Sequence, residues 1–370
     1  MISDMADRFS PKFRRNVARV IPFGMIWLFT GWMFLLSEAL YVGNENINSA
    51  IDIRVTPPIF AFASVCIFLL GVQVGIIETL VLQTRFLGYS FLRKITLKFV
   101  IYLLMMLLAI GITYPTAALI EMGSSYDLSI IGSKTIQFFL SSMFLNTLLQ
   151  LSFSLFLCLL YSAVSENLGH NVLLSFFTGK YNRPVVERRI FMFLDMKDST
   201  AIAERLGHDQ YFKLLFDYYD LMSAPIINSL GEVYQYVGDE VVVTWKAKQG
   251  LPKNNCINCF ADIKQSLKRK EDYFMDRYGV VPHFKAGLHM GEVTTGEIGA
   301  LKKEIFFVGD VLNTSARMQE MCNNYNVDLI ISNDLYAELD QNTHNVQQLG
   351  DIVLKGKTQP TIVFSVLPMH

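Results

Sequence analysis

Residues 190–200 read IFMFLDMKDST, an apolar run that ends in an acidic residue and continues into a polar loop. A short apolar run bounded by polar residues is typical of a buried strand. Ser199 or Thr200 can cap a helix that begins near Ala201, because a side-chain oxygen at that point accepts a backbone N–H of the first turn. The stretch therefore predicts a strand that brings Asp195 to the start of a helix.

The chain downstream alternates between helical and strand-like patterns. The stretch GEVYQYVGDEVVVTW (231–245) predicts a hairpin with Asp239 in its turn. Because hairpins interrupt the alternation of strands and helices, we expect an α+β domain with a mixed sheet and flanking helices. The other predicted helices cover 208–230, 258–278 and 311–321, and the other predicted strands cover 284–289, 293–297, 329–332, 351–354 and 362–366.

Four long apolar runs precede this domain, at 20–42, 57–82, 99–120 and 136–164. Each exceeds the roughly 20 residues that a helix needs to cross about 30 Å of hydrocarbon. Four such runs in succession favour transmembrane helices over buried core helices. The first run is too long for a signal-peptide core and lacks a small-residue cleavage site, so it is not interpreted as a cleavable leader.

The charges of the short connecting segments predict the orientation. The tail 1–19 has five basic residues and the second loop (83–98) has four, whereas the loops 43–56 and 121–135 have one each. By the positive-inside rule, the tail, the second loop and everything after residue 165 are cytoplasmic. We therefore predict a cytoplasmic basic tail (1–19), a four-helix transmembrane domain (20–165) in the cell's inner membrane, a linker (166–187) and a cytoplasmic domain (188–370). The linker should be partly helical over 171–177.

Three polar residues lie within the apolar runs. Glu78 is expected near the cytoplasmic end of the second span, close enough to reach the interface. Asn146 and Gln150 are four residues apart and share one helix face, where they can help helices associate. A ligand or proton site in the bundle is the alternative that these residues leave open.

The overall composition excludes some classes of protein. With 32 basic and 33 acidic residues, the chain lacks the basic surface of a nucleic-acid binder. Five cysteines without a secretory context do not form a disulfide framework. Cys256 and Cys259 lack the second pair or the histidines that a zinc site needs, so we interpret them as ordinary cysteines.

Asp195 and Asp239 are the candidate metal ligands of the domain. One ends a strand, the other lies in a hairpin turn, and the loop 196–200 leads into a helix N-terminus. Mg²⁺ prefers carboxylate oxygens together with substrate phosphates, and helix N-termini favour anions. The two acids should cluster and repel each other without a metal. These are the components of metal–triphosphate chemistry.

Five motifs in order over residues 187–368 resemble the class III adenylate/guanylate cyclase catalytic domain: FLDMKDST, YQYVGDE, FKAGLHMGEV, FVGDVLNTSARMQ and LKGK. The resemblance implies a ferredoxin-like α+β fold behind a membrane anchor. It implies that Asp195, Asp239 and the backbone carbonyl of Met196 hold two ions, Mg²⁺ or Mn²⁺. It also places Ser199 and Thr200 on the phosphate-binding loop, where the family more often has Phe-Thr.

The resemblance assigns the other half of the site to three residues. Asn313 matches the residue that orients the ribose, Arg317 the one that stabilises the transition state, and Lys355 the lysine that binds terminal phosphates. In this family the metals come from one subunit and these three side chains from the other. The implied active unit is therefore a homodimer with shared sites.

The base-selecting positions depart from the family. Adenylate cyclases of this family have Lys and Asp where this chain has Gln235 and Phe306, and guanylate cyclases have Glu and a small residue. A phosphate-binding Arg of some relatives falls near Glu292. His289 lies on an apolar strand and is expected to be packed rather than catalytic.

We expect a membrane-anchored cyclase that converts ATP to cyclic AMP and pyrophosphate. The alternatives are a guanylate or pyrimidine nucleotide cyclase, and a non-catalytic membrane receptor whose cyclase-like domain only dimerises.

Overall fold

The computed structural model describes residues 10–42, 53–82, 90–123, 127–168, 170–300, 303–341, 343–352 and 360–366. The chain divides into two compact units, residues 14–174 and residues 175–370 together with the first 13. Each unit has its own hydrophobic core, so each is described by itself.

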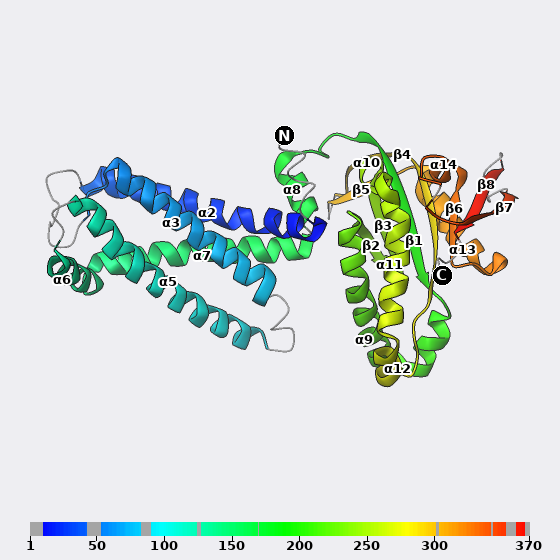
Figure 1. Ribbon diagram of the computed structural model, residues 1–370, viewed down its shortest axis with the longest axis horizontal. Coiled ribbons are helices and arrows are strands. Elements are labelled where there is room, and N and C mark those ends of the chain that lie inside the picture. The colour runs from blue at the N-terminus through cyan, green and yellow to red at the C-terminus, as the bar shows by residue number, and fades with distance from the viewer. Residues whose placement is uncertain are drawn as a thin grey trace. The chain divides into compact units, whose positions relative to one another are not determined.

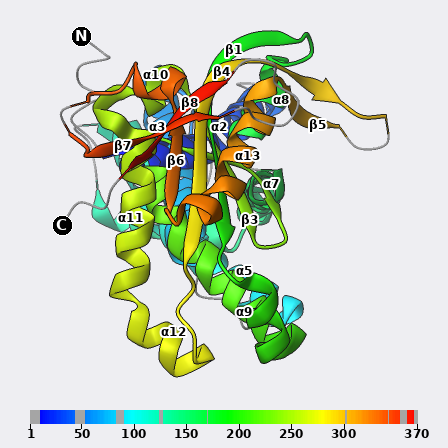
Figure 2. The ribbon, with the colours of Figure 1, turned by 90° about the vertical axis from the view of Figure 1, so that its right-hand side faces the viewer.

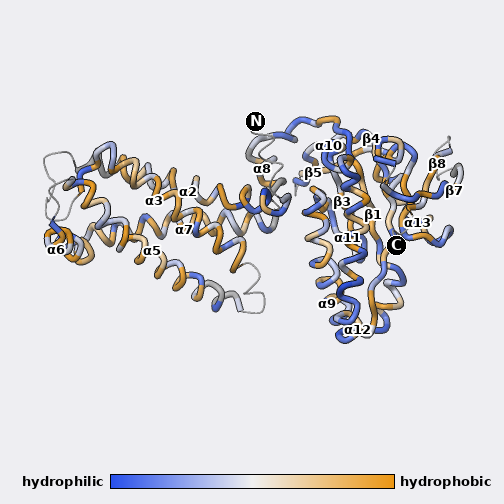
Figure 3. Tube along the Cα trace, viewed as in Figure 1, coloured by the Kyte–Doolittle hydropathy of each residue, from blue (hydrophilic) through white to orange (hydrophobic). Residues whose placement is uncertain are grey.

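The N-terminal unit is helical (Figure 1). Four helical stretches are long and apolar enough to cross a membrane, which confirms the four apolar helices expected from the sequence. Figure 3 shows that hydrophobic residues extend along these helices. The elements are α2 (Pro11–Val42), α3 (Pro57–Ile76), its π-helical extension η1 (Ile77–Leu82), α5 (Phe91–Met122), α6 (Leu128–Phe139) and α7 (Ser142–Leu168).

The fourth apolar run is not one helix. It begins in α6 and is interrupted at Leu140 and Ser141, after which α7 begins at Ser142. The loop predicted over 121–135 accordingly contains most of α6. The aromatic rings of Phe138, Phe139 and Phe144 pack across the interruption, with centroids 5.0–5.9 Å apart.

Close packing between α2 and α3 depends on Gly71 and Gly75. A Cβ at Gly71 would lie 2.8 Å from the Phe23 carbonyl oxygen and from Trp27 side-chain atoms, and a Cβ at Gly75 would lie 3.0 Å from the Phe23 side chain. These glycines form a small-residue motif with a spacing of four, which lets helices approach closely in lipid. They therefore fix the seam that buries Phe23 and Trp27.

Glu78 is enclosed within the helical bundle, and its position relative to a membrane interface stays a prediction. It is 3% exposed, and its carboxylate accepts hydrogen bonds from Lys98 and Tyr102 of α5. A buried carboxylate needs such partners, so η1 and α5 are joined by a polar contact within the bundle. Asn146 is exposed and Gln150 half-buried, so their role in helix association stays a prediction.

The C-terminal unit follows a short helix, α8 (His170–Thr178), which confirms the helix expected over 171–177. It contains an eight-stranded sheet in the order β2-β3-β1-β4-β6-β8-β7, with β5 paired to β4. The β4–β6 pair is parallel and the others are antiparallel, which confirms the mixed sheet. The strands are β1 (Val185–Met196), β2 (Glu232–Val237), β3 (Glu240–Lys246), β4 (Phe284–Ile298), β5 (Glu304–Val308), β6 (Leu329–Ser332), β7 (Val346–Ile352) and β8 (Thr361–Val366).

Helices cover both faces of this sheet (Figures 1 and 2). α9 and α11 pack on one face around the main core, and α13 packs on the other against β1, β4 and β6. The helices are α9 (Ser199–Asn228), α10 (Ala247–Gly250), the 3₁₀ turn η3 (Pro252–Asn254), α11 (Asn255–Arg269), α12 (Glu271–Tyr278), α13 (Asp310–Tyr325) and α14 (Asn333–Tyr336).

The alternation along β1 decides which side chains meet which helices. Met192 and Leu194 enter the α9–α11 core, whereas Phe193 lies on the α13 face. Because strand side chains alternate with a period of two, Asp195 also lies on the α13 face.

Several predicted elements differ in extent. The two strands predicted over 284–297 are one strand, β4, and the helix predicted over 258–278 divides into α11 and α12 at Lys270. β5 (EIFFV) was not predicted. β1 begins at Val185, within the predicted linker.

Candidate active site

Two carboxylates lie together at one end of the sheet. Asp195 is the penultimate residue of β1, and Asp239 lies in the turn between β2 and β3. The register Leu194↔Val241 brings that turn beside the end of β1. Partial burial and the negative charge of Asp239 raise the pKa of Asp195 above its usual value. The predicted clustering and repulsion of the two acids are therefore present in the fold.

Asp195 has two partners that sequence reasoning missed. Lys285 lies directly opposite in the β1–β4 register, with Nζ 3.4 Å from Asp195 Oδ2. Gln319 Nε2 of α13 donates to the same oxygen at 3.0 Å. A signal for Lys285 exists in the sequence, because it is a lysine within the otherwise apolar strand FKAGLHM. Nothing local in the sequence marks Gln319.

A glycine lets α13 approach the sheet closely enough for this contact. A Cβ at Gly287 would lie 2.3 Å from the Ser315 carbonyl oxygen and 2.4 Å from the Gln319 backbone nitrogen. Real Cβ atoms do not approach that closely, so any other residue would push α13 away from β4. Gly287 therefore positions Gln319 over Asp195.

The carboxylate pair fits a divalent cation. Asp239 Oδ2 is buried and has no hydrogen-bond partner, and a buried anionic oxygen without a partner is costly unless a cation completes it. Burial, followed by the charges of Asp195 and Asp239, raises the pKa of the adjacent Glu240 to about 7. The local field thus attracts positive charge.

The side chains alone do not complete a coordination shell. Within the described residues, no group of three or more His, Cys, Asp or Glu side chains is arranged to hold a metal ion. An ion on Asp195 and Asp239 would take further oxygen ligands from the Met196 carbonyl, from water or from substrate phosphates, which suits Mg²⁺.

The predicted phosphate loop ends at a helix N-terminus. α9 begins at Ser199, and its first helical N–H bond runs from Ile202 to the Asp198 carbonyl oxygen. The preceding N–H groups of the first turn, including that of Thr200, are therefore available to an anion. Ser199 is half-buried and Thr200 exposed.

Asn313 and Arg317 lie on the outer side of α13. Asn313 is exposed and Arg317 half-buried, and in the described part of the chain neither makes a hydrogen bond or an ion pair. A helix turns about 100° per residue, so Arg317 is about 200° around the helix from Gln319. One chain therefore directs Gln319 towards Asp195 and directs Asn313 and Arg317 away from it.

Gln235 and Phe306 flank an aromatic contact. Their neighbours Tyr234 and Phe307 pack edge to face with ring centroids 4.9 Å apart, which brings β2 and β5 close together at this point. Gln235 is exposed, and Phe306 is 46% exposed. Ile305 and Phe307 both pack in the cluster on the α13 face, so Phe306 between them lies on the opposite face of the sheet.

The other described residues considered in the sequence analysis lie outside the carboxylate cluster. His289 is buried and its Nδ1 lies 2.7 Å from Ser332 Oγ, so it is packed as expected. Cys256 and Cys259 are buried free thiols, and burial raises the pKa of each to about 12. Glu292 is exposed. Lys355 lies outside the described residues.

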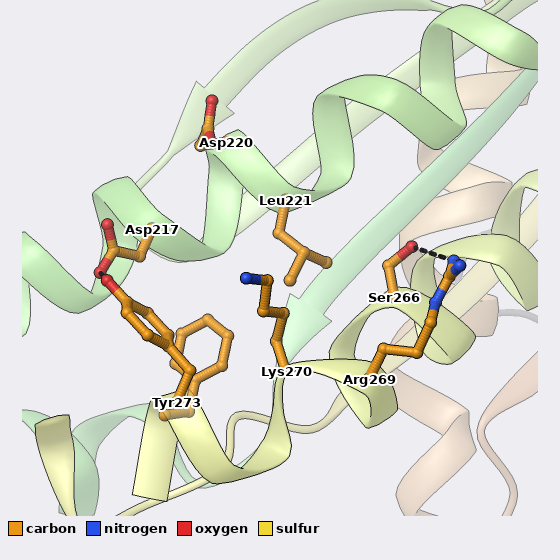
Figure 4. Close-up of a pocket in the computed structure, with 8 residues that line it drawn as sticks. Asp217, Asp220, Leu221, Ser266, Arg269, Lys270 and Tyr273 are labelled. Carbon is orange, nitrogen blue, oxygen red and sulfur yellow. Dashed lines mark hydrogen bonds between the residues drawn. The ribbon is translucent and has the colours of Figure 1, made fainter. Parts of the chain in front are cut away.

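A groove of about 530 Å³ lies elsewhere in this unit (Figure 4). It runs between α9 and the α11–α12 corner, where Tyr273 donates to Asp217. None of the candidate site residues lines it, and it lies on the face opposite α13. This groove is therefore separate from the candidate site.

Comparisons with known proteins agree with this geometry. Residues 186–366 match the family model described as "Adenylate and Guanylate cyclase catalytic domain". Adenylate cyclase 2 of Rhizobium meliloti (strain 1021) is 35% identical over 204 residues, which are 55% of this chain and 56% of that protein. Adenylate cyclase 1 of the same organism is 24% identical over 48% of this chain and 27% of that protein.

A structure of a bacterial light-regulated adenylyl cyclase superposes with a TM-score of 0.53 at 19% identity, covering 61% of this chain and 65% of that one. This likeness concerns the fold. The matched region spans just over half of Adenylate cyclase 2 and about a quarter of Adenylate cyclase 1. Family members depend in general on divalent metals, which agrees with the carboxylate pair. Residues 186–366 therefore form a class III adenylate and guanylate cyclase catalytic domain.

Proposed function

We propose that this protein is a membrane-anchored nucleotide cyclase that converts ATP to cyclic AMP and pyrophosphate at composite sites of a homodimer. The observation that carries the proposal is the carboxylate pair beside the α9 N-terminus, with a buried Asp239 oxygen that has no partner. A metal–triphosphate complex supplies both the cation and the anion that these groups lack.

The residues act as follows. Asp195 and Asp239 hold two ions, with the Met196 carbonyl as a further ligand. When bound, the ions lower the pKa of the ribose 3′-hydroxyl and neutralise the leaving phosphates. The first-turn N–H groups of α9, with Ser199 and Thr200, bind the terminal phosphates.

The second subunit contributes the remaining groups. Asn313 orients the ribose, so that the 3′-oxygen attacks the α-phosphorus and the bond to the pyrophosphate oxygen breaks. Arg317 offsets the charge that develops on the phosphoryl oxygens, and Lys355 binds the terminal phosphates. The outward direction of Asn313 and Arg317 on α13 supports this division between two chains.

An apolar patch supports dimerisation. The exposed side chains of Phe212, Phe216, Tyr236 and Val237 are 51–70% accessible, on α9 and the edge strand β2. Tyr219 packs at a tilt against Tyr236, with ring centroids 4.6 Å apart, and donates to the Gly238 carbonyl, so the patch borders the turn that holds Asp239. Exposed aromatic clusters mark interaction sites. A second copy of this chain seated there would lie next to the metal ligands.

ATP is the preferred substrate because the two relatives from Rhizobium meliloti are adenylate cyclases. The Gln235 amide both donates and accepts hydrogen bonds, so it can serve either purine, and Phe306 adds only apolar contact. These two residues make GTP the second candidate substrate.

We further propose an inner-membrane location with the N-terminal tail and the catalytic domain in the cytoplasm. The excess of basic residues in the segment 1–19 and in the second loop supports this orientation.

The product identifies the activity. The full-length protein in detergent is incubated with each of ATP, GTP, CTP and UTP in the presence of Mn²⁺, and the product is identified by mass spectrometry. We expect cyclic AMP and pyrophosphate from ATP, and none from an Asp239→Asn control. If the protein cyclises none of the four triphosphates, the cyclase proposal is wrong and the non-catalytic receptor remains as the alternative. Exclusive turnover of CTP or UTP would exclude a purine site.

Complementation tests the composite site. Asp195→Ala and Arg317→Ala proteins should each be inactive. Their mixture should regain activity, because one of the two sites in a heterodimer is intact. Subunit exchange is checked independently by co-purification of two differently tagged chains. Exchange without recovered activity would mean that each site lies within one chain.

A further inference from the structure

The two candidate metal ligands have unequal surroundings. Asp239 Oδ2 is buried without a partner, whereas Asp195 Oδ2 contacts both Lys285 Nζ at 3.4 Å and Gln319 Nε2 at 3.0 Å. The side chain of Lys285 is only 11% exposed, and Gln319 is 4% exposed. Packing therefore holds both partners against the carboxylate.

The lysine and a metal ion would compete for the same oxygen. Lys285 carries a full positive charge, and its ammonium is the cation that pairs with Asp195 within the described residues. A divalent ion held by Asp195 and Asp239 would have to displace that contact or share it at the cost of charge repulsion. Gln319 is neutral, so its hydrogen bond orients the carboxylate without repelling a cation.

We propose that Lys285 is a positioning residue that holds Asp195 in place in the metal-free protein and sets the affinity for the metal by competing with it. Gln319 is the complementary positioning residue, which keeps the carboxylate turned towards the Asp239 side in both states. The proposal rests on the metal-binding role of Asp195 in the proposed function, but not on the identity of the nucleotide.

Opposite effects on metal binding follow from this assignment. Removing an oriented outer partner of a metal ligand commonly weakens metal binding by about 10–100-fold. Gln319→Leu should accordingly weaken binding, by about tenfold. Lys285→Met should strengthen it by about tenfold, because the competing charge is removed while the length of the side chain is kept. If Lys285 had only a structural role, its replacement would weaken metal binding.

The measurement is Mn²⁺ binding to the full-length protein in detergent, followed by the electron paramagnetic resonance signal of free Mn²⁺ in the absence of nucleotide. Lys285→Arg keeps the charge and should bind Mn²⁺ with close to wild-type affinity. The matched control is Lys264→Met, which removes a lysine that pairs with Asp328 and not with Asp195. Asp328 keeps its second partner, Lys197, at 2.6 Å, so this control should also leave Mn²⁺ affinity unchanged.

Unchanged or weaker Mn²⁺ binding in a folded Lys285→Met protein would overturn the proposal, and so would tighter binding in the Lys264→Met control. Should the Lys285→Met protein fail to fold, amine labelling of the wild-type chain gives the answer by mass spectrometry. Mn²⁺ should increase labelling at Lys285 and leave Lys264 unchanged, whereas equal labelling of Lys285 with and without Mn²⁺ would refute displacement. If the protein shows these metal responses but forms no cyclic nucleotide, the inference about Lys285 holds and the proposed function is wrong.

Discussion

The two acidic residues should differ in what their removal does to stability. In the metal-free protein, Asp239 has a buried oxygen without a partner and faces the charge of Asp195. Asp239→Asn removes one of two repelling charges and adds an amide that can donate to Asp195. A buried unsatisfied group costs about 1–3 kcal/mol. Since Asp239 is only half-buried, we expect a gain of about 1 kcal/mol in the free energy of unfolding.

Asp195→Ala should have the opposite effect. It leaves the ammonium of Lys285 and the amide of Gln319 without their shared acceptor. Removing one partner of a buried ion pair costs about 3–5 kcal/mol. The Asp195 side chain is 28% exposed, and water will solvate part of what remains, so we expect a loss of about 2 kcal/mol. The two variants should therefore differ by about 3 kcal/mol, although both should be inactive.

Urea unfolding followed by tryptophan fluorescence measures this difference. Trp245 is fully buried in the C-terminal unit, and a Trp27→Phe, Trp32→Phe background makes it the only tryptophan of the chain. Saturating Mn²⁺ should stabilise the parent protein and neither acid variant. Equal stabilities of the two variants, or a less stable Asp239→Asn protein, would refute the assigned electrostatics.

Three further outcomes are expected. The ratio of kcat/KM for ATP to kcat/KM for GTP should be below about 10⁴ in the wild-type protein, the value typical of discrimination by hydrogen bonds. The double substitution Gln235→Lys, Phe306→Asp should raise this ratio. No increase would mean that other groups select the base. Burial alone would raise the pKa of Glu187, but the hydrogen bond and charge of Arg189 outweigh it and lower that pKa. The ionised Glu187 therefore stabilises the folded protein fully above its usual pKa of 4.5. This stabilisation is lost as the pH falls through the lower pKa that Glu187 has in the folded state. Glu187→Gln should thus cost about 2 kcal/mol near pH 7, from the loss of a buried pair, and the difference in unfolding free energy should shrink towards pH 3. Iodoacetamide should leave the Cys256 thiol unmodified in the folded protein, since the thiol is buried and its pKa is raised to about 12; rapid alkylation seen by mass spectrometry would contradict this.

The sequence predicted features that depend on local patterns. The strand that ends at Asp195 and the hairpin turn at Asp239 follow from apolar runs and turn residues a few positions apart. The interruption of the fourth apolar run at Leu140 was missed, because a hydropathy window averages over about 19 residues. The helix break at Leu140 is packed by aromatic residues, which are themselves apolar, so it leaves the average hydropathy of the window unchanged.

Contacts between distant residues could not be predicted in this way. Gln319 and Asp195 are 124 positions apart, and their contact requires the β1–β4 register, the α13 position and the space left by Gly287. Each of these is set by packing of the whole domain and not by neighbours in the chain. The partners that hold Asp195 in place were therefore found only in the folded structure, although Asp195 itself was found from a motif.

The arrangement of α13 supports the proposed division of the site between two chains. A helix that packs on a sheet has one inward side, and Gln319 and Ser315 occupy it here, both buried. Arg317, between them in sequence, must then lie on the outward side. No rotation of α13 could bring Arg317 to Asp195 in the same chain without burying its charge against Gly287 and exposing the core. The metal-ligand side of a second chain can instead meet the outward-facing Asn313 and Arg317 without any change in the packing of α13. The packing of this helix therefore favours catalysis between subunits.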